Sequence, residues 1–169
     1  EFKPGSYYDT TIGSQHPYWC DQDLPQPSKD IQRLRADMLR WGYCKVEEAL
    51  SEEQVRIVRH RVLEQAEGER RAGIAQKTPS GQNINCCVNK GRCFELLIEQ
   101  HPSQVQGGPL IEQLVTEALG PGWISTSLIG AISLKGGVPQ ALHQDQGNDP
   151  DSRSPMSVNV LTAISNIDE

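Results

Sequence analysis

The chain has 169 residues and a formal net charge of −6, which is the size and balance of one acidic globular domain. General binding to nucleic acid or to anionic membranes requires a basic field, which an acidic chain does not provide. No apolar run approaches the roughly 20 residues that cross a bilayer, and the first residues do not show a basic and then apolar signal sequence. We therefore expect a cytoplasmic protein without nucleic-acid or membrane partners.

The cysteines are odd in number and irregularly spaced: Cys20, Cys44, Cys86, Cys87 and Cys93. Neither a disulfide framework nor a zinc ribbon has this arrangement. The sequence therefore predicts reduced thiols.

Two helices are predicted in the first half of the chain. Residues 1–27, rich in Pro and aromatic residues, read as an irregular arm. Ser28 can cap a helix whose apolar residues recur at helical spacing until Gly42. An edge strand at 43–46 follows, and Ser51 with Gln54 forms a capping box for a second helix, which has Val55, Val58 and Val62 on one face.

The middle of the chain is less regular. Residues 68–82 are polar and contain Gly and Pro, which predicts a long loop that we place on the substrate side. A short strand at 84–88, a helical turn at 94–98 and a helix from Pro109 to Leu119 follow.

The hydrophobic period then changes to that of β-strands. Apolar and polar residues alternate over 123–134 and again over 156–164. These two predicted strands flank the loop 135–155, which carries the residues of greatest chemical interest.

This loop contains Gln140-Ala141-Leu142-His143-Gln144-Asp145-Gln146. Residues two apart in an extended segment point to the same side, so His143 and Asp145 can place a nitrogen and an oxygen on one ion. Two histidines and one carboxylate leave three octahedral positions open on Fe(II), as an oxygenase needs. A His-x-Asp tripeptide is common by chance, however, and two solvated loop residues are the alternative interpretation.

Several stretches in order resemble the phytanoyl-CoA dioxygenase family and its relatives that oxidise secondary metabolites. They are 41–46, 49–55, 89–97, 119–123, the Gln140-x-x-His143-x-Asp145 signature, 157–163 and the final Asp168-Glu169. The signature segment is the specific part of the resemblance, and the other stretches support it by their order and spacing.

The resemblance implies a fold that is mainly β with flanking N-terminal helices. This fold is a double-stranded β-helix, or cupin-like jelly roll, and it is incomplete in this chain, so that residues 28–169 form the N-terminal portion of one oxygenase domain. It also implies Fe(II) held by His143 and Asp145, with 2-oxoglutarate as cosubstrate and O2 as oxidant. Hydroxylation of a small organic molecule is the expected outcome, and Asp145 argues against halogenation.

The resemblance further places Gln140, Asn159 and Leu161 at the cosubstrate. Ser133 is a further candidate, because it lies on the preceding predicted strand next to the metal loop. Gln140 would donate its amide to 2-oxoglutarate, although a loop amide that bonds its own turn is an equal alternative. For Asn159 and Leu161 the competing interpretation is a structural one. The Asn159 amide would then be a strand side chain that forms its hydrogen bonds with backbone groups.

Two parts of the family's site do not occur in this sequence. The family has a second histidine ligand and a cosubstrate arginine downstream, whereas His16, His60 and His101 all precede the motif and Arg153 does not fit. His60 is better interpreted as a solvated helix residue. We therefore expect a fragment or the first portion of a longer polypeptide. The expected protein partner is a second copy of the chain or the remainder of the same polypeptide.

Two other functions remain open. One is a non-catalytic β-helix scaffold or half-module that lacks a complete iron site, because a fold does not guarantee its chemistry. The other is an unrelated metal hydrolase, for which no positioned base and nucleophile are evident.

Overall fold

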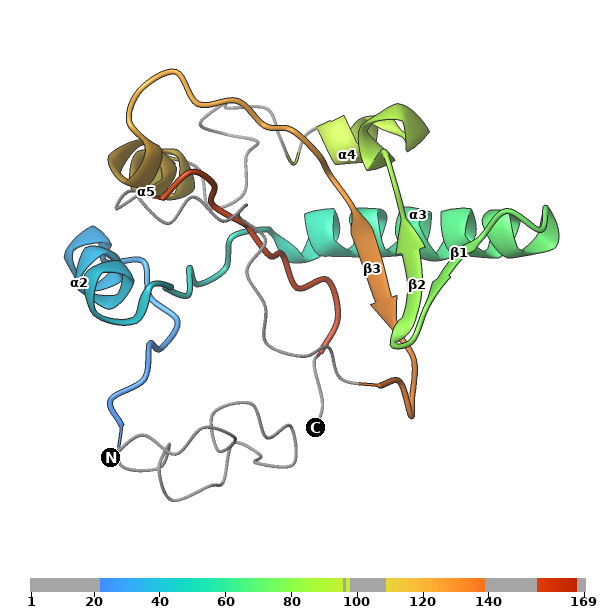
Figure 1. Ribbon diagram of the computed structural model, residues 1–169, viewed down its shortest axis with the longest axis horizontal. Helices are drawn as coiled ribbons and strands as arrows, with labels where there is room; N and C mark the ends of the chain where they lie inside the picture. The colour runs from blue at the N-terminus through green and yellow to red at the C-terminus, as the bar shows by residue number, and fades with distance from the viewer. Residues whose placement is uncertain (1–21, 96, 98–108, 139–154, 167–169) are drawn as a thin grey trace.

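The structure, a computed structural model, describes residues 22–95, 97, 109–138 and 155–166. In these ranges it contains four α-helices, one 3-10 helix and one three-stranded antiparallel sheet. Figure 1 shows α3 (Glu52–Arg71) crossing behind the sheet, while α2 (Ile31–Trp41) and α5 (Pro109–Leu119) lie together at the opposite end. Arg35 of α2 and Glu117 of α5 join these two helices by an ion pair.

The first predicted helix is confirmed as α2, but its cap is Asp30 rather than Ser28. The Asp30 carboxylate accepts a hydrogen bond of 2.9 Å from the backbone N–H of Gln32. Ser28 instead forms an isolated parallel bridge with Val46, so its backbone is committed to an extended pairing. This single bridge is all that the structure shows of the strand predicted at 43–46. Gly42 ends the helix at φ 75°, a value that favours glycine.

The second predicted helix is confirmed as α3, together with its capping box. The Ser51 hydroxyl accepts from the backbone N–H of Gln54, and the Gln54 side chain accepts from the backbone N–H of Ser51. Val58 and Val62 are buried as expected, whereas Val55 is half-buried. The helix continues to Arg71, because Gly68 can adopt helical geometry at a modest entropic cost.

A β-hairpin replaces the long loop predicted at 68–82. β1 (Gln76–Thr78) pairs antiparallel with β2 (Gly81–Ile84), and Thr78 lies opposite Gly81 across the turn. The strand predicted at 84–88 is wrong, because β2 ends at Ile84 and Cys86 adopts a left-handed conformation of φ 52°. The 3-10 helix η1 (Cys87–Lys90) and the short helix α4 (Arg92–Glu95) follow.

The third strand, β3 (Gly130–Ser133), completes the sheet by pairing antiparallel with β2. Gly81 lies opposite Ser133, and a Cβ atom added to Gly81 would lie 1.9 Å from the carbonyl oxygen of Ile132. A side chain at position 81 would therefore force β2 and β3 apart.

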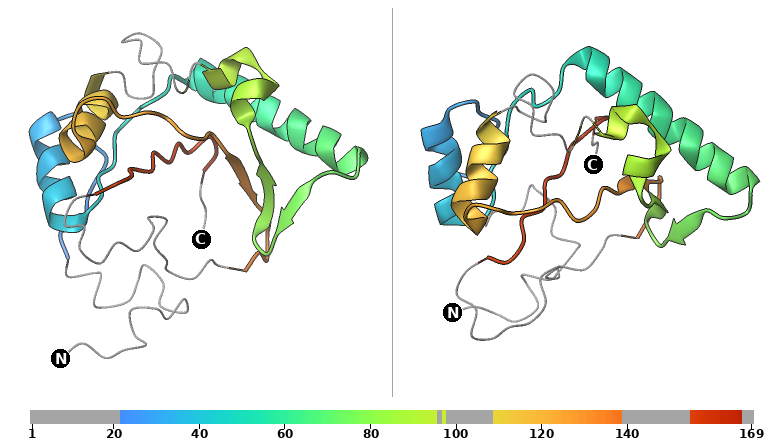
Figure 2. Two further views of the ribbon diagram at one scale, coloured as in Figure 1. Left: turned by 45° about the horizontal axis from the view of Figure 1, so that its top comes forward. Right: turned by 90° about the horizontal axis from the view of Figure 1, so that it is seen from above.

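The hydrophobic core lies between α3 and the sheet. Its buried members are Val58, Val62, Ala66, Ile84, Cys87 and Phe94, and the half-buried residues packed on them include Leu128, Ile132 and Ile164. Figure 2 shows residues 155–166 running from beside the α2–α5 pair towards the sheet. Ile164 thus joins the end of the described chain to the core.

The predicted mainly-β jelly roll is wrong for the described residues, where helix exceeds strand and a single small sheet is present. Of the strand predicted at 123–134, only β3 forms, and no strand forms within residues 155–166. Alternation reports which side chains share a face, but a strand also needs a neighbouring chain for its backbone hydrogen bonds. β2 supplies such a neighbour for four residues only.

No helix in the described ranges combines the length and the apolar character needed to cross a membrane.

Candidate functional site

The central residues of the predicted metal site, Gln140, His143 and Asp145, lie outside the described residues. Their assignment as metal ligands and cosubstrate contact therefore stays a prediction from the sequence. The structure describes the chain on both sides of this segment, up to Val138 and again from Pro155.

The segment that leads towards the motif is hydrogen-bonded to the turn of the β1–β2 hairpin. The backbone N–H of Leu134 donates to the carbonyl of Ser80 at 2.9 Å, and that of Val138 donates to Pro79 at 3.1 Å. Gly137 packs so closely that an added Cβ would lie 2.5 Å from the Ser80 oxygen. The described part of this segment, up to Val138, thus has a defined position relative to the sheet.

Ser133, Asn159 and Leu161, the other predicted cosubstrate residues, are all exposed. Ser133 lies on β3, next in sequence to Ile132, which packs on the core. Leu161 is 95% exposed, whereas Val158 and Ile164 are half-buried. Asn159 and Leu161 therefore lie on the surface, and the described residues do not enclose them in a pocket with Ser133.

Among the described residues, no three His, Cys, Asp or Glu side chains are grouped so that they could hold a metal ion. This finding leaves the predicted ligands untested, because both lie outside those ranges. His60 is exposed on α3, in agreement with its interpretation as a helix surface residue.

A buried polar cluster that the sequence did not predict joins α3 to β2 and η1. The Glu69 side chain is only 6% exposed, and its carboxylate accepts hydrogen bonds from Lys90, from Gln65 at 3.0 Å and from Gln82 at 3.4 Å. Arg70 donates in turn to the Gln82 side chain at 3.0 Å. The hydrogen bond from Lys90 is the main reason why the pKa of Glu69 is lowered. We call Gln65, Glu69, Gln82 and Lys90 the Glu69 cluster.

This cluster could not be predicted from the sequence, because Glu69 and Gln82 both fall in the loop predicted at 68–82, and only the structure extends α3 as far as Arg71. The paired, charge-neutralising geometry is typical of a structural connection. We therefore interpret it as a structural cluster and not as the candidate active site.

The thiols are poor candidates for nucleophilic chemistry. The described cysteines are free, and burial raises the pKa of Cys44, Cys87 and Cys93 above the usual value. The Cys87 thiol also donates to the Ile84 carbonyl at 3.2 Å. Because the thiolate is the reactive form, burial makes these three side chains less reactive than an ordinary cysteine.

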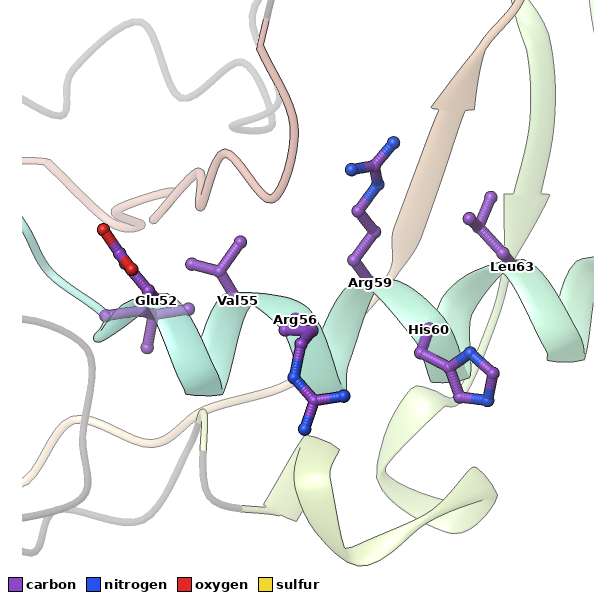
Figure 3. Close-up of a pocket in the computed structure, with 7 residues that line it drawn as sticks. Glu52, Val55, Arg56, Arg59, His60 and Leu63 are labelled. Atoms are coloured by element: carbon purple, nitrogen blue, oxygen red, sulfur yellow. The ribbon is translucent and has the colours of Figure 1, made fainter.

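A surface hollow of about 420 Å³ lies on the outer side of α3 (Figure 3). It is lined by Leu50, Glu52, Val55, Arg56, Arg59, His60 and Leu63. Two rows of side chains border it, with Val55, Arg59 and Leu63 in one row and Arg56 and His60 in the other. From the sequence only His60 was singled out here, as an exposed helix residue; the two rows become evident only once the bounds of α3 are known.

Comparisons with protein-family models, with curated proteins and with solved structures find no match to this chain.

Proposed function

We propose that the chain belongs to an Fe(II)- and 2-oxoglutarate-dependent oxygenase that hydroxylates a small organic molecule, and that it supplies His143 and Asp145 as two of the iron ligands. The observation that carries this proposal is the segment Gln140-x-x-His143-x-Asp145. The resemblance to the phytanoyl-CoA dioxygenase family supports the proposal through the order of the other matching stretches. The proposal does not include the jelly roll, because the described residues do not form one.

The chemistry of the donor set supports Fe(II). An imidazole nitrogen and a carboxylate oxygen suit this ion, and a facial set of two histidines and one carboxylate leaves positions for a bidentate cosubstrate. The four cysteines among the described residues are free thiols, which fit a reducing compartment, and we propose the cytoplasm.

In this proposal each residue has a distinct task. His143 binds through an unprotonated ring nitrogen, Asp145 binds as a carboxylate, and Gln140 donates its amide to the cosubstrate. Iron, 2-oxoglutarate and O2 together supply the oxidising chemistry. A third protein ligand is required, and the resemblance implies that it is a second histidine.

The test is an anaerobic titration of the purified protein with Fe(II) and then 2-oxoglutarate, monitored by equilibrium dialysis and by the visible charge-transfer band of the iron chelate. We expect wild-type protein to give the band. His143→Ala and Asp145→Ala should each lower Fe(II) affinity by at least about tenfold, since even outer partners of metal ligands contribute about 10–100-fold.

His60→Ala is the matched control, because it removes an exposed imidazole outside the motif. It should bind iron as wild-type protein does. Equal affinity in His143→Ala and wild type would refute the metal assignment. Iron binding without substrate-dependent succinate formation would favour the non-catalytic half-module.

A further inference from the structure

The hollow on α3 is a groove between two ridges of the helix surface. Glu52, Arg56 and His60 are spaced four residues apart, and so are Val55, Arg59 and Leu63. Rows with this spacing form the ridges between which a second helix packs. Leu63 is 48% exposed and lies in this groove, so apolar surface is also available there.

The groove contains a free acidic group and a free basic group. Arg56 is held by Glu53, with its Nε 2.8 Å from the carboxylate. Glu52 and Arg59 are exposed, and neither has an ion pair or hydrogen bond with the described residues. They are seven residues apart, about 10 Å along the helix axis, so they do not pair with each other.

The shape of the surface favours a macromolecular partner. Sites for small molecules are concave and enclose most of the ligand, whereas this groove lies along the exposed side of one helix (Figure 3). The partner that complements the groove must present an acid where α3 has Arg59 and a base where α3 has Glu52. The same helix running in the opposite direction satisfies both requirements.

We propose that α3 is the contact between two copies of this chain, packed antiparallel about a two-fold axis near Val55 and Arg56. Each Glu52 then faces Arg59 of the second copy. Both residues lie about 5 Å along the helix from the crossing point. At that distance, two helices that cross at roughly 50° have moved apart sideways by only about 4 Å, which an arginine side chain can span. The reversal also brings Leu63 of one copy towards Leu50 of the other.

A groove on one helix buries less than the roughly 800 Å² per partner of a standard interface, so the dimer is weak, with a Kd on the order of 100 μM. Sedimentation velocity of the full chain across concentrations on both sides of this value tests it. Glu52→Arg and Arg59→Glu should each weaken association by about tenfold, because like charges then meet. The double variant Glu52→Arg/Arg59→Glu restores opposite charges and should return to near wild-type affinity.

Lys77→Glu is the control, since it makes the same change of charge as Arg59→Glu on exposed β1, away from the groove. It should leave the dimer unchanged. A wild-type chain that stays monomeric throughout would overturn the proposal. The proposal would also be overturned if neither single change weakened association, or if the double variant failed to restore it. Either result would point to exposed apolar residues elsewhere, such as Ile124 and Leu161.

Discussion

Removing the Lys90 ammonium is the sharpest test of how the Glu69 cluster stabilises the fold. The Glu69 side chain is 6% exposed and that of Lys90 is 25% exposed, so Lys90→Met leaves a nearly buried carboxylate without its cation. Loss of a hydrogen bond to a charged group costs about 1.5–3 kcal/mol. Because water reaches the Lys90 position and Gln65 and Gln82 still donate to the carboxylate, we expect about 2 kcal/mol.

The effect also has a defined pH dependence. The pKa of Glu69 is lowered in the folded protein, first by its hydrogen bond with Lys90, so the unfolded chain binds more protons in the acid range. The resulting stability is present above the unfolded pKa of about 4.3 and is lost as pH falls through the folded pKa. Lys90→Met lacks most of this contribution, so the difference from wild type should be largest near neutral pH and should shrink on acidification.

Urea unfolding with linear extrapolation, at neutral pH and at several acidic values, measures both quantities. Lys77→Met is the matched control, because Lys77 is exposed and has no ion pair with the described residues. If Lys90→Met loses no more stability than Lys77→Met at neutral pH, solvent compensates fully for the lost ammonium. The proposed stabilisation by the Glu69 cluster would then be refuted.

Two further changes test the packing. Gly81→Ala should lower the free energy of unfolding by up to about 3 kcal/mol, because the added Cβ would meet the Ile132 oxygen. Gly68→Ala lies in open space on α3 and should raise the free energy of unfolding by roughly 0.5–1 kcal/mol. If the two changes have the same sign in urea unfolding, the β2–β3 approach is wrong. Phe94→Ala should cost about 3–5 kcal/mol because Phe94 is 2% exposed, whereas Leu39→Ala, 90% exposed, should stay within about 0.5 kcal/mol. Thermal unfolding checks this pair, and a small loss for Phe94→Ala would contradict its place in the core.

The helices were the part of the fold that could be read from local sequence. The Ser51 and Gln54 capping box and the Gly42 stop act within a few residues of the helix ends, so the pattern and the structure agree there. The hairpin could not be read in this way. Gln76–Thr78 and Gly81–Ile84 have little apolar alternation, and they become strands because Ile84 packs on α3 and β3 lies alongside.

The jelly roll was wrong for a related reason. The alternation at 156–164 matches the exposure only in part, because Val158 and Ile164 are half-buried while Met156 and Val160 of the same phase are exposed. Nor does alternation provide a neighbouring strand. Side-chain phase is a property of the sequence, whereas backbone pairing depends on the distance to another segment.

The same division holds for function. The sequence by itself determined the candidate iron ligands His143 and Asp145, because their spacing is local and their chemistry belongs to the side chains. Only the tertiary structure decided which charges are buried together, as in Glu69 with Lys90, and which lie exposed without a partner among the described residues, as with Glu52 and Arg59. The pairing of buried charges depends on packing between segments far apart in the sequence, and the exposure of the other charges depends on what that packing leaves uncovered. No local sequence pattern encodes the pairing or the exposure.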